Sequence, residues 1–454
     1  MFTSIILAAG MGTRMKSEIP KVLHKVCGKE LCRCVSDASK NAGADKVVAV
    51  VGHKAELVKE ALGGECEFVL QSEQKGTGHA VMQAADYINN AGGYVVILNG
   101  DTPLITAQTI KAAMEYHKEN GNSVTVLTAV FDDATGYGRI VRDSDGNVIK
   151  IVEQKDADEN EKLIKEINSG MYVFNSGDLA EALTKLTPNN AQGEYYLTDT
   201  VEILIGSGRK AGAYIIEDND EIRGVNDRVQ LHEAEKIMHD RIVEKHMRNG
   251  VTMRFPESVY IEDDVEIGND TEIGGNVELL SGTKIGNGCI IGMGSRLDGA
   301  VLSDGVEVLS SVILNSEIGS GAHVGPFAYV RPDCKVGKNV KVGDFVELKN
   351  SVIDDGTKIS HLTYIGDSDV GKNVNFGCGT VTCNYDGKKK FRSKIGDNSF
   401  IGCNTNLVSP VEVGDRAYIA AGSTITEDIP EGSMSIARNR QVNKIGWADE
   451  HKKY

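Results

Sequence analysis

The chain has 454 residues, a formal net charge of −16 and nine cysteines. This length exceeds what one ordinary hydrophobic core needs, so two or three domains are expected. The negative charge argues against sequence-independent binding to nucleic acid, and the odd number of cysteines, none in a CxxC pair, argues against a disulfide framework.

The first residues, MFTSIILAAGMGTRM, are apolar only briefly and run at once into a glycine-rich turn. They do not look like a signal peptide, and no apolar run approaches the length that spans a bilayer. We therefore expect a cytoplasmic protein that does not associate with a membrane.

Residues 1–226 alternate short β-branched runs with helical stretches. Buried strands are expected in SIILAAG, KVVAVVG, YVVILNGD, SVTVLTAV and GMYVFN, with helices such as HAVMQAADYIN between them. This alternation is typical of an α/β domain, and by itself it favours a mostly parallel sheet.

A glycine-rich turn, Gly10 to Arg14, follows the first strand. It lacks the third glycine of a dinucleotide fingerprint and the Gly-Lys-Ser/Thr of a Walker loop. Its backbone N–H groups can still face phosphates, and Arg14 and Lys21 can offset charge on a transferring phosphoryl group. A tight strand-to-helix turn without a ligand would have the same sequence pattern.

The segment LNGDTPL ends another buried strand with Asp101. Open α/β sheets bind ligands beyond the carboxyl ends of their strands. A carboxylate there is a candidate Mg²⁺ ligand, because this ion takes a few oxygen donors beside substrate phosphates. The alternative is an ordinary Asp-Thr-Pro turn.

Residues 227–250 are expected to form a helix that joins two halves. The stretch before Gly250 contains no Gly or Pro, with Asp227 as its N-cap and Gly250 as its stop. Apolar residues recur along it at helical spacing: Leu231, Ala234, Met238 and Ile242.

From about residue 259 the period becomes six, which is the signature of a parallel β-helix with short strands and sharp corners. Residues 251–454 are therefore expected to form a rod. Three series of aliphatic residues are expected to point inward: Ile261, Ile267, Ile273, Leu279, Ile285, Ile291 and Leu297; Val306, Val312, Ile318, Val324, Val330, Val336, Val342 and Leu348; Ile395, Ile401, Leu407, Val413, Ile419 and Ile425.

The segment HLTYIGD departs from this repeat. Ile359 and Ile365 take the inward positions. Strand alternation then turns Tyr364 outward and puts His361 at or just after a corner, which disfavours a buried structural role for the histidine.

Further irregularities lie close by in sequence. Arg331 and Lys349 stand where glycine usually follows the inward aliphatic residue, and the frame slips by one before Ile353 and again before Val370. Residues 382–394, TCNYDGKKKFRSK, are expected to form an extruded loop. Such a loop marks either the binding face of a solenoid or only a solvated basic surface.

These motifs, in this order, resemble the bacterial bifunctional N-acetylglucosamine-1-phosphate uridylyltransferase / glucosamine-1-phosphate acetyltransferases over essentially the whole chain. LAAGMGTRM with IPKVLH is typical of sugar-nucleotide pyrophosphorylases. QKGTGHA, GYGRI, IVEQKDA, EINSGMY and GVNDR are similar to the uridylyltransferase half, and HLTYIGD with GTVTCNYDGKKK is similar to the acetyltransferase half.

The resemblance implies a Rossmann-like mixed sheet in residues 1–226, a linker helix at 227–250 and a left-handed parallel β-helix at 251–454. It implies acetyl transfer from acetyl-CoA to glucosamine-1-phosphate. Uridylyl transfer from UTP to N-acetylglucosamine-1-phosphate would follow, with Mg²⁺ and release of pyrophosphate. The product, UDP-N-acetylglucosamine, is a precursor of peptidoglycan and lipopolysaccharide, and the family is homotrimeric.

The resemblance also carries over residue by residue in the first half. Arg14 and Lys21 would stabilise phosphate charge, and Asp101 and Asn226 would bind the metal ion. Contacts with UTP or UDP-N-acetylglucosamine are expected at Leu7, Ala8, Ala9, Gly10, Lys21, Gln71, Gly76, Thr77, Asn99, Gly100, Asp101, Gly138, Glu153, Asn168 and Asn226.

In the second half, His361 is similar to the general base and Glu347 to its orienting carboxylate. Contacts with glucosamine-1-phosphate are expected at Arg331, Lys349, Tyr364 and Asn375. Contacts with acetyl-CoA and its acceptor are expected at Cys378, Asn384, Tyr385, Cys403, Ala421 and Arg438. Asn99, Cys378 and Cys403 depart from the residue types usual in the family, and the two cysteines should make acetyl transfer sensitive to thiol reagents.

Two alternatives remain open at this point. The chain could be a single-activity sugar-1-phosphate nucleotidyltransferase whose rod only builds the oligomer. It could also be a non-enzymatic nucleotide-sensing subunit of a larger assembly.

Overall fold

A computed structural model describes residues 1–451 of the chain. They divide into two compact units, one of residues 1–239 and one that begins at residue 240. No helix among residues 1–451 combines the length and apolar character needed to cross a bilayer.

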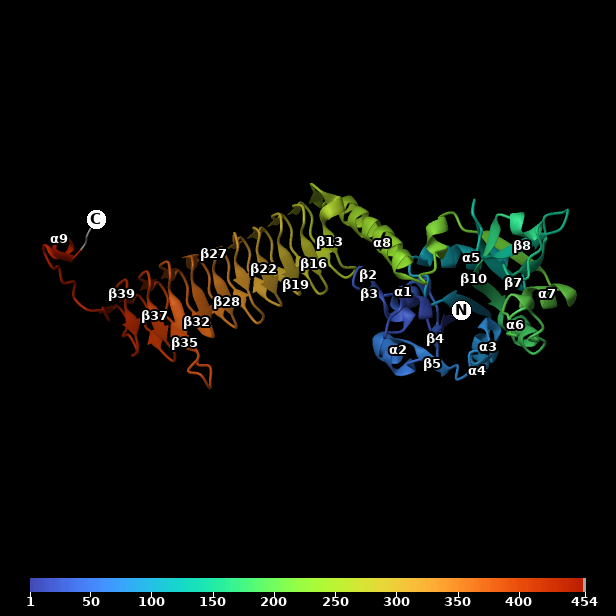
Figure 1. Cartoon of the computed structure of the whole chain (residues 1–454), viewed down its shortest axis with the longest axis horizontal. Helices are drawn as coiled ribbons and strands as arrows, with labels where there is room; N and C mark the ends of the chain where they lie inside the picture. The colour runs from blue at the N-terminus through green and yellow to red at the C-terminus, as the bar shows by residue number, and fades with distance from the viewer. Residues whose placement is uncertain (452–454) are drawn as a thin grey trace. The chain divides into compact units, whose positions relative to one another are not determined.

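The first unit is built on a mixed sheet whose main path is β11-β7-β10-β6-β1-β4-β5, with β8 and β9 attached beside β10 (Figure 1). Its strands are β1 (Phe2–Ala8), β4 (Lys46–Val51), β5 (Glu67–Leu70), β6 (Tyr94–Asn99), β7 (Val124–Val130), β8 (Gly138–Arg142), β9 (Val148–Val152), β10 (Glu166–Asn175) and β11 (Ala211–Ile215). A separate pair is β2 (Lys25–Val26) with β3 (Lys29–Glu30).

All five predicted strands are present in this sheet. β1 runs parallel to β4 and β6, whereas β10 runs antiparallel to β6, β7 and β8. Along the main path only β10 runs against its neighbours, so the mostly parallel sheet favoured by the alternation is confirmed, and so is the mixed sheet implied by the resemblance.

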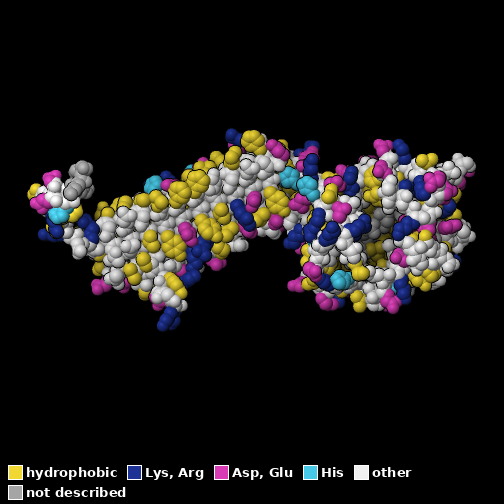
Figure 2. All heavy atoms as spheres, viewed as in Figure 1, with side chains coloured by type: hydrophobic (Ala, Val, Ile, Leu, Met, Phe, Trp, Pro, Cys, Tyr) yellow, Lys and Arg dark blue, Asp and Glu magenta, His cyan; other side chains and the backbone are white. Residues whose placement is uncertain are grey.

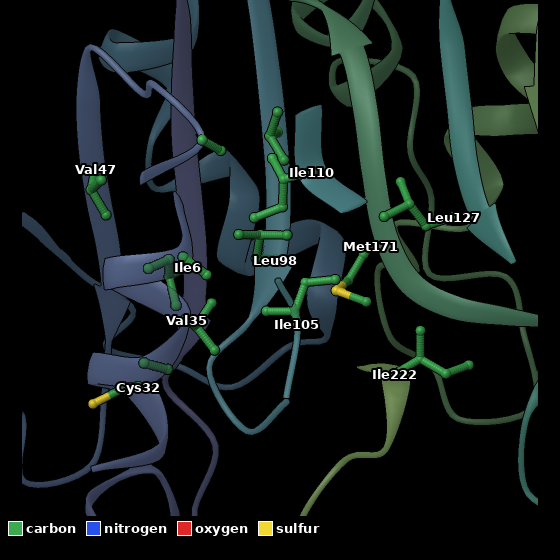
Figure 3. Packing of buried hydrophobic residues seen from close by; sticks show 14 of the residues in the cluster. Ile6, Cys32, Val35, Val47, Leu98, Ile105, Ile110, Leu127, Met171 and Ile222 are labelled. Carbon is green, nitrogen blue, oxygen red and sulfur yellow. The ribbon is translucent and has the colours of Figure 1, made fainter. Parts of the chain in front are cut away.

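Helices cover both faces of the sheet, each over its own buried apolar cluster. One face carries α1 (Leu31–Asn41), α2 (Ala55–Leu62) and α5 (Ala107–Glu119); the other carries α3 (Thr77–Met82), α4 (Ala85–Asn89), α6 (Ser176–Leu183) and α7 (Asp199–Gly206). Figure 3 shows Cys32 and Val35 of α1 beside Ile6 of β1. The predicted helix HAVMQAADYIN is divided between α3 and α4.

The predicted linker helix is α8 (Arg228–Arg248). The side chain of Asp227 accepts hydrogen bonds from the backbone N–H groups of Val229 and Gln230, each at 2.9 Å, and so caps its first turn. Gly250 follows with a φ of 91°, the left-handed conformation with which glycine commonly ends a helix. Both predicted helix signals are confirmed.

The second unit is a parallel β-helix of strands two to four residues long, from β12 (Thr252–Met253) to β41 (Met434–Ser435) (Figure 1). From β12 to β40, each strand pairs with the strand three positions away, which gives three sheets and three strands per coil. The predicted hexapeptide rod is confirmed, but its predicted extent, residues 251–454, is too long, because no strand follows Ser435 within the described residues. A short helix, α9 (Trp447–His451), follows it.

One predicted inward position is wrong. Val312 lies half-buried on the outside, and Ile313 is fully buried in its place. The reason is a shortened step: Val308 and Ile313 are both buried but only five residues apart. The slips predicted before Ile353 and Val370 are confirmed, since both side chains are buried.

The predicted extruded loop leaves the rod between β34 (Val381–Cys383) and β35 (Ser393–Ile395). The loop is shorter than the predicted residues 382–394, because Thr382 and Asn384 at its start are buried. An isolated antiparallel bridge joins Tyr385 to Lys390, and Figure 1 shows the loop projecting near β35.

Candidate active sites

A pocket of about 290 Å³ opens in the first unit at the carboxyl ends of β1 and β6. This is the edge at which open α/β sheets bind ligands. It is lined by nine of the predicted contacts: Leu7, Ala9, Gly10, Lys21, Gln71, Gly76, Thr77, Asn99 and Asp101. Two more lie directly behind them: Ala8 is buried at the end of β1, and the Gly100 N–H donates to the Leu7 carbonyl at 2.9 Å.

Backbone geometry shapes the pocket. Gly12 has a φ of 61°, and a Cβ there would lie 2.5 Å from the Cβ of Lys21, so only glycine lets the turn pack against this lysine. Across the pocket, Gln74 Nε2 donates to the Ala9 carbonyl at 2.8 Å. The glycine turn and the loop before α3 are therefore tied together around the space that they enclose.

Charged and amide groups meet at one end of the pocket. The Lys21 ammonium donates to Asp101 Oδ2 and, at 3.0 Å, to Asn226 Oδ1. Arg14 Nη2 donates to the same Asn226 oxygen at 2.9 Å. The two predicted phosphate-binding cations and the two predicted metal ligands thus come together from distant parts of the chain.

Asp101 and Asn226 both reach one ammonium group, so their oxygens lie within reach of a single small cation. One carboxylate and one amide oxygen suit Mg²⁺, which keeps several waters and takes phosphate oxygens. No cluster of three or more His, Cys, Asp or Glu residues within 1–451 is arranged to hold a metal ion. The two protein oxygens therefore fit a metal ion whose remaining ligands come from the substrate and water, and they do not form a complete protein coordination shell.

The three predicted sugar contacts also meet. A Cβ on Gly138 would lie 3.4 Å from Glu153 Oε2 and 3.5 Å from the Cβ of Asn168. Burial raises the pKa of the Glu153 carboxyl, and the Thr198 hydroxyl donates to it at 3.2 Å. Asn99 Nδ2 donates to a backbone carbonyl of β10 at 3.0 Å, which connects the pocket wall to the strand that carries Asn168.

In the rod, the predicted frame around His361 is confirmed. Ile359 and Ile365 are fully buried, His361 is exposed and Tyr364 is half-buried. Leu362 has a φ of 43°, so the chain turns a corner directly after the histidine.

His361 belongs to a column of side chains at this corner. The column crosses β27 (Lys341–Asp344), β30 (Lys358–His361), β33 (Asn375–Phe376), β36 (Phe400–Ile401) and β39 (Tyr418–Ile419). The register pairs Asp344 with His361 and continues in the same alignment through the next three coils. In coil order the column reads Asp344, His361, Cys378, Cys403 and Ala421. Three predicted acetyl-CoA contacts therefore lie in line with the predicted base.

Arg438 joins the far end of this column, because a Cβ on Gly422 would lie 3.5 Å from its Cδ. Asn375 lies half-buried on the outer face of β33. Tyr385 is exposed on the projecting loop, where its hydroxyl donates to the Gly387 carbonyl at 2.7 Å.

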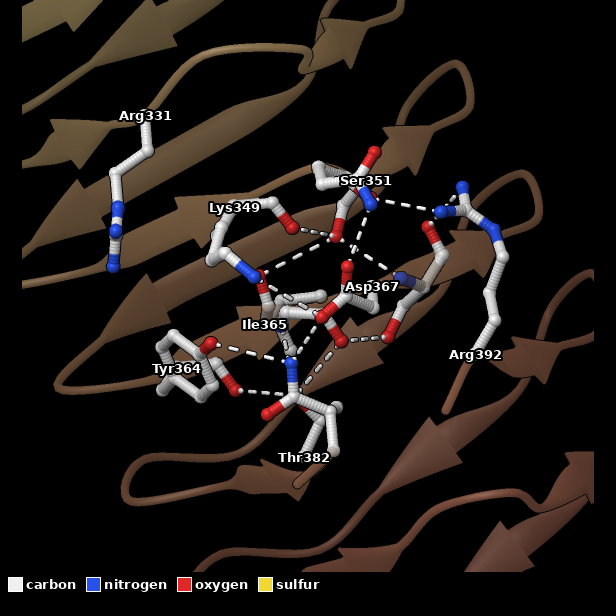
Figure 4. Close-up of polar contacts among 12 residues, drawn as sticks. Arg331, Lys349, Ser351, Tyr364, Ile365, Asp367, Thr382 and Arg392 are labelled. Atoms are coloured by element: carbon white, nitrogen blue, oxygen red, sulfur yellow. Dashed lines mark hydrogen bonds and ion pairs between the residues drawn. The ribbon is translucent and has the colours of Figure 1, made fainter. Parts of the chain in front are cut away.

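A network of polar side chains lies on the neighbouring sheet, around Asp367 (Figure 4). Lys349 Nζ and Asn384 Nδ2 donate to Asp367 Oδ2 at 3.2 Å and 2.5 Å, and Asn350 donates to Oδ1 at 2.6 Å. Burial alone would raise the pKa of Asp367, but the bonds from Asn350 and Lys349 outweigh it and hold the pKa below its usual range. Asn384 also donates to the Tyr364 hydroxyl at 3.4 Å.

Three members of this network were not predicted from the sequence: Asn350, Asp367 and Lys390. Asp367 is the last residue of HLTYIGD, and its place in that motif was the available signal. Lys390 belongs to the basic run of the projecting loop; the neighbouring Lys349 ammonium lowers its pKa, and Arg331 adds to the effect. Three cations gathered at one place suit a phosphate group.

The prediction that Glu347 orients His361 is wrong for the contacts within this chain. Glu347 lies in β28 (Glu347–Lys349), on a different sheet from β30, and accepts a hydrogen bond from Arg331 Nη1 at 3.0 Å. His361 Nδ1 instead lies 2.7 Å from Asp344 Oδ1.

Comparison with known proteins adds two family matches. Residues 3–233 match the family described as nucleotidyl transferase. Residues 264–299, 315–350 and 392–427 match the family described as bacterial transferase hexapeptide (six repeats).

Full-length bacterial proteins are also similar to this chain. It is 60% identical over 444 residues to the bifunctional protein GlmU of Acetivibrio thermocellus, covering 98% of this chain and 96% of that protein. It is 56% identical over 447 residues to the protein of the same name from Caldanaerobacter subterraneus subsp. tengcongensis, covering 98% and 97%. The corresponding Clostridioides difficile protein is 55% identical over 449 residues, covering 99% and 98%.

Proposed function

The chain belongs to the family of bifunctional GlmU proteins, and we propose how its two units divide the synthesis of UDP-N-acetylglucosamine. The second unit acetylates glucosamine-1-phosphate with acetyl-CoA. The first unit couples the resulting N-acetylglucosamine-1-phosphate to UTP and releases pyrophosphate. One observation carries this division: phosphate-binding cations and metal-type oxygens meet in the first unit, whereas the exposed histidine column lies in the second.

Uridylyl transfer needs no general base, because its nucleophile is a sugar phosphate that is already anionic at neutral pH. Arg14 and Lys21 draw the reacting phosphates together and offset their charge. Gly138, Glu153 and Asn168 orient the sugar, and the glycine turn and Gln71 hold the nucleotide. A divalent ion, which we propose to be Mg²⁺ on Asp101 and Asn226, supplies further charge neutralisation at the phosphates.

Acetyl transfer does need a base, because the amine of glucosamine-1-phosphate is largely protonated near neutral pH. His361 removes a proton, the amine nitrogen attacks the acetyl carbonyl, and CoA leaves as a thiolate. A thiol with a reference pKa of about 8.5 is a good leaving group without further help. Arg331 and Lys349 bind the phosphate of the amino sugar. Acetyl-CoA lies along Cys378, Cys403, Ala421 and Arg438, with neither cysteine acting as a nucleophile.

We further propose that the working form is a cytoplasmic homotrimer of contacting rods; both UTP and acetyl-CoA are cytoplasmic metabolites. Figure 2 shows hydrophobic side chains gathered along the visible face of the rod. Beside His361, the corner exposes Phe327, Phe345 and Leu362 to 59%, 58% and 57%, and the two phenylalanine rings stack at 5.4 Å. Contiguous exposed apolar side chains are typical of contact surfaces. A second copy covering them would also enclose the exposed histidine.

Two assays on the purified full-length protein test the division. One follows CoA release from acetyl-CoA and glucosamine-1-phosphate, and the other follows pyrophosphate release from UTP and N-acetylglucosamine-1-phosphate. We expect turnover in both. Pyrophosphate without CoA would favour the single-activity nucleotidyltransferase, and no turnover in either would favour a nucleotide-sensing subunit.

A further inference from the structure

We propose that Asp344 is the positioning residue of His361 in acetyl transfer, an inference that rests on the proposed acetyltransferase function. Asp344 ends β27 and His361 ends β30, one coil later, and the two residues are register partners. Their side chains meet with 2.7 Å between Asp344 Oδ1 and His361 Nδ1. The β-helix thus holds the carboxylate directly beneath the imidazole.

This contact determines which ring nitrogen can act as the base. The hydrogen bond from His361, followed by smaller effects that include nearby Lys341, holds the pKa of Asp344 below its usual range, so the carboxyl is ionised near neutral pH. An ionised carboxylate only accepts hydrogen bonds, so the proton of the neutral imidazole must sit on Nδ1. Nε2 then keeps its lone pair for the amine of the acceptor.

Asp344 also favours the state formed after proton transfer. Once Nε2 has taken the proton, the imidazole is positively charged and faces the ionised carboxylate at hydrogen-bond distance. The carboxylate therefore serves two purposes, since it selects the useful tautomer and stabilises the imidazolium ion.

Asp344 Oδ1 is the carboxylate oxygen that lies at hydrogen-bond distance from His361. Glu347, the expected candidate, accepts from Arg331 at 3.0 Å. A substitution of Glu347 should therefore act on phosphate binding through Arg331, whereas a substitution of Asp344 should act on the base. The two carboxylates make distinguishable predictions.

The rod contains a matched control. His323 Nδ1 lies 2.6 Å from Glu307 Oε2, also between register partners one coil apart. This pair lies along the flat face of the sheet and not in the corner column. A histidine–carboxylate contact therefore occurs on this rod without a catalytic setting, and Glu307→Gln removes one without touching the proposed site.

The experiment compares Asp344→Asn, Glu347→Gln and Glu307→Gln in the full-length protein, with kcat and KM for acetyl transfer and the rate of uridylyl transfer. Asp344→Asn keeps the shape of the side chain, and the pair lies at the surface with His361 exposed and Asp344 half-buried, so we expect it to fold. We expect its kcat for acetyl transfer to fall about 10- to 100-fold, because general-base catalysis contributes about 10²–10⁴. The KM for glucosamine-1-phosphate should stay within about twofold.

Glu347→Gln should instead raise this KM more than it lowers kcat, and Glu307→Gln should leave both values near those of the wild type. All three variants should keep uridylyl transfer. An Asp344→Asn protein with wild-type kcat would overturn the proposal, and a kcat loss in Glu347→Gln alone would restore Glu347 as the positioning carboxylate. If the wild type itself releases no CoA, the proposed function fails, which is a separate outcome.

Discussion

The two units assemble their sites in opposite ways. In the first unit, Arg14 and Asn226 share a hydrogen bond although 212 residues separate them in sequence. In the rod, Asp344 and His361 touch because they are 17 residues apart, one coil of the repeat. The first site depends on the fold of a whole domain, whereas the second depends on local register. The chemistry divides in the same way, into charge neutralisation in a pocket and proton transfer at an exposed corner.

Removal of divalent metal should separate the two units most strongly. We expect a chelator to abolish uridylyl transfer, because Asp101 and Asn226 of the first site, beside the phosphate-binding Lys21, are the proposed metal ligands. Acetyl transfer should continue at its full rate, measured as CoA release in the same buffer. Added Mg²⁺ should restore the lost activity. Equal loss of both activities would contradict the assignment of the metal-dependent reaction to the first unit alone.

Replacement of one proposed metal ligand should also lower uridylyl transfer, but by less than removal of the metal ion. Asp101→Ala should lower the rate of uridylyl transfer by about 100-fold or more, since a metal ion contributes several kcal/mol of charge stabilisation. CoA release should be unchanged. Asp86→Ala, in an exposed position on α4, is the control for a lost carboxylate in this unit. Retained metal-dependent uridylyl transfer would remove Asp101 from the metal site.

Thiol modification should act only on the rod. The four cysteines of the first unit are buried, whereas Cys378 is half-buried and Cys403 exposed in the corner column. We expect a maleimide to reduce acetyl transfer several-fold and to spare uridylyl transfer, with CoA detected by a method that does not use its thiol. The Cys378→Ser/Cys403→Ser double variant should resist the reagent.

Cys383 provides the matched control, because it is exposed but lies outside the column. A Cys383→Ser variant should remain as sensitive as the wild type. If this single change alone protected acetyl transfer, the column would not be the path of acetyl-CoA.

The smallest expected effect concerns the stability of the first unit and the half-buried carboxyl of Asp199. Burial raises the pKa of Asp199 to about 6. Because this folded-state pKa is above the unfolded value, the ionised carboxylate destabilises the fold above pH 6, and stability is regained as the pH falls through 6 toward 4. Asp199→Asn should therefore stabilise the first unit by about 1 kcal/mol at pH 8, after allowance for the partial exposure of the group.

Thermal unfolding at pH 8 and pH 4 measures this difference. The advantage of the variant should shrink or disappear at the lower pH. An equal gain at both pH values would mean that the stabilisation does not come from removal of the charge.

The fold was largely predictable where a pattern repeats or a cap is explicit. The hexapeptide frame gave the outward Tyr364 and the corner position of His361, and Asp227 signalled the start of α8. The predicted inward position at Val312 was wrong because Val312 and Ile313 are both aliphatic. Residue types alone do not show that the spacing between inward residues shortens from six to five at this point. The antiparallel course of β10 was equally hidden, since strand composition does not encode direction.

The sites were less predictable from residues alone. No local pattern connects Arg14 to Asn226, so only the family resemblance placed them together. In the rod, the pairing of His361 with Asp344 could have been read from a 17-residue coil, but the resemblance pointed to Glu347. Contacts between coils depend on exact coil length, which a period of six gives only on average.

The most direct test of the division is the product formed by the full-length His361→Ala protein from two acceptors. With UTP and N-acetylglucosamine-1-phosphate, the variant should make UDP-N-acetylglucosamine at the rate of the wild type. With UTP, acetyl-CoA and glucosamine-1-phosphate, it should make almost none, because the base that frees the amine is missing. Loss of product from both acceptors in a folded protein, or normal product from both, would contradict the assignment of one chemistry to each unit.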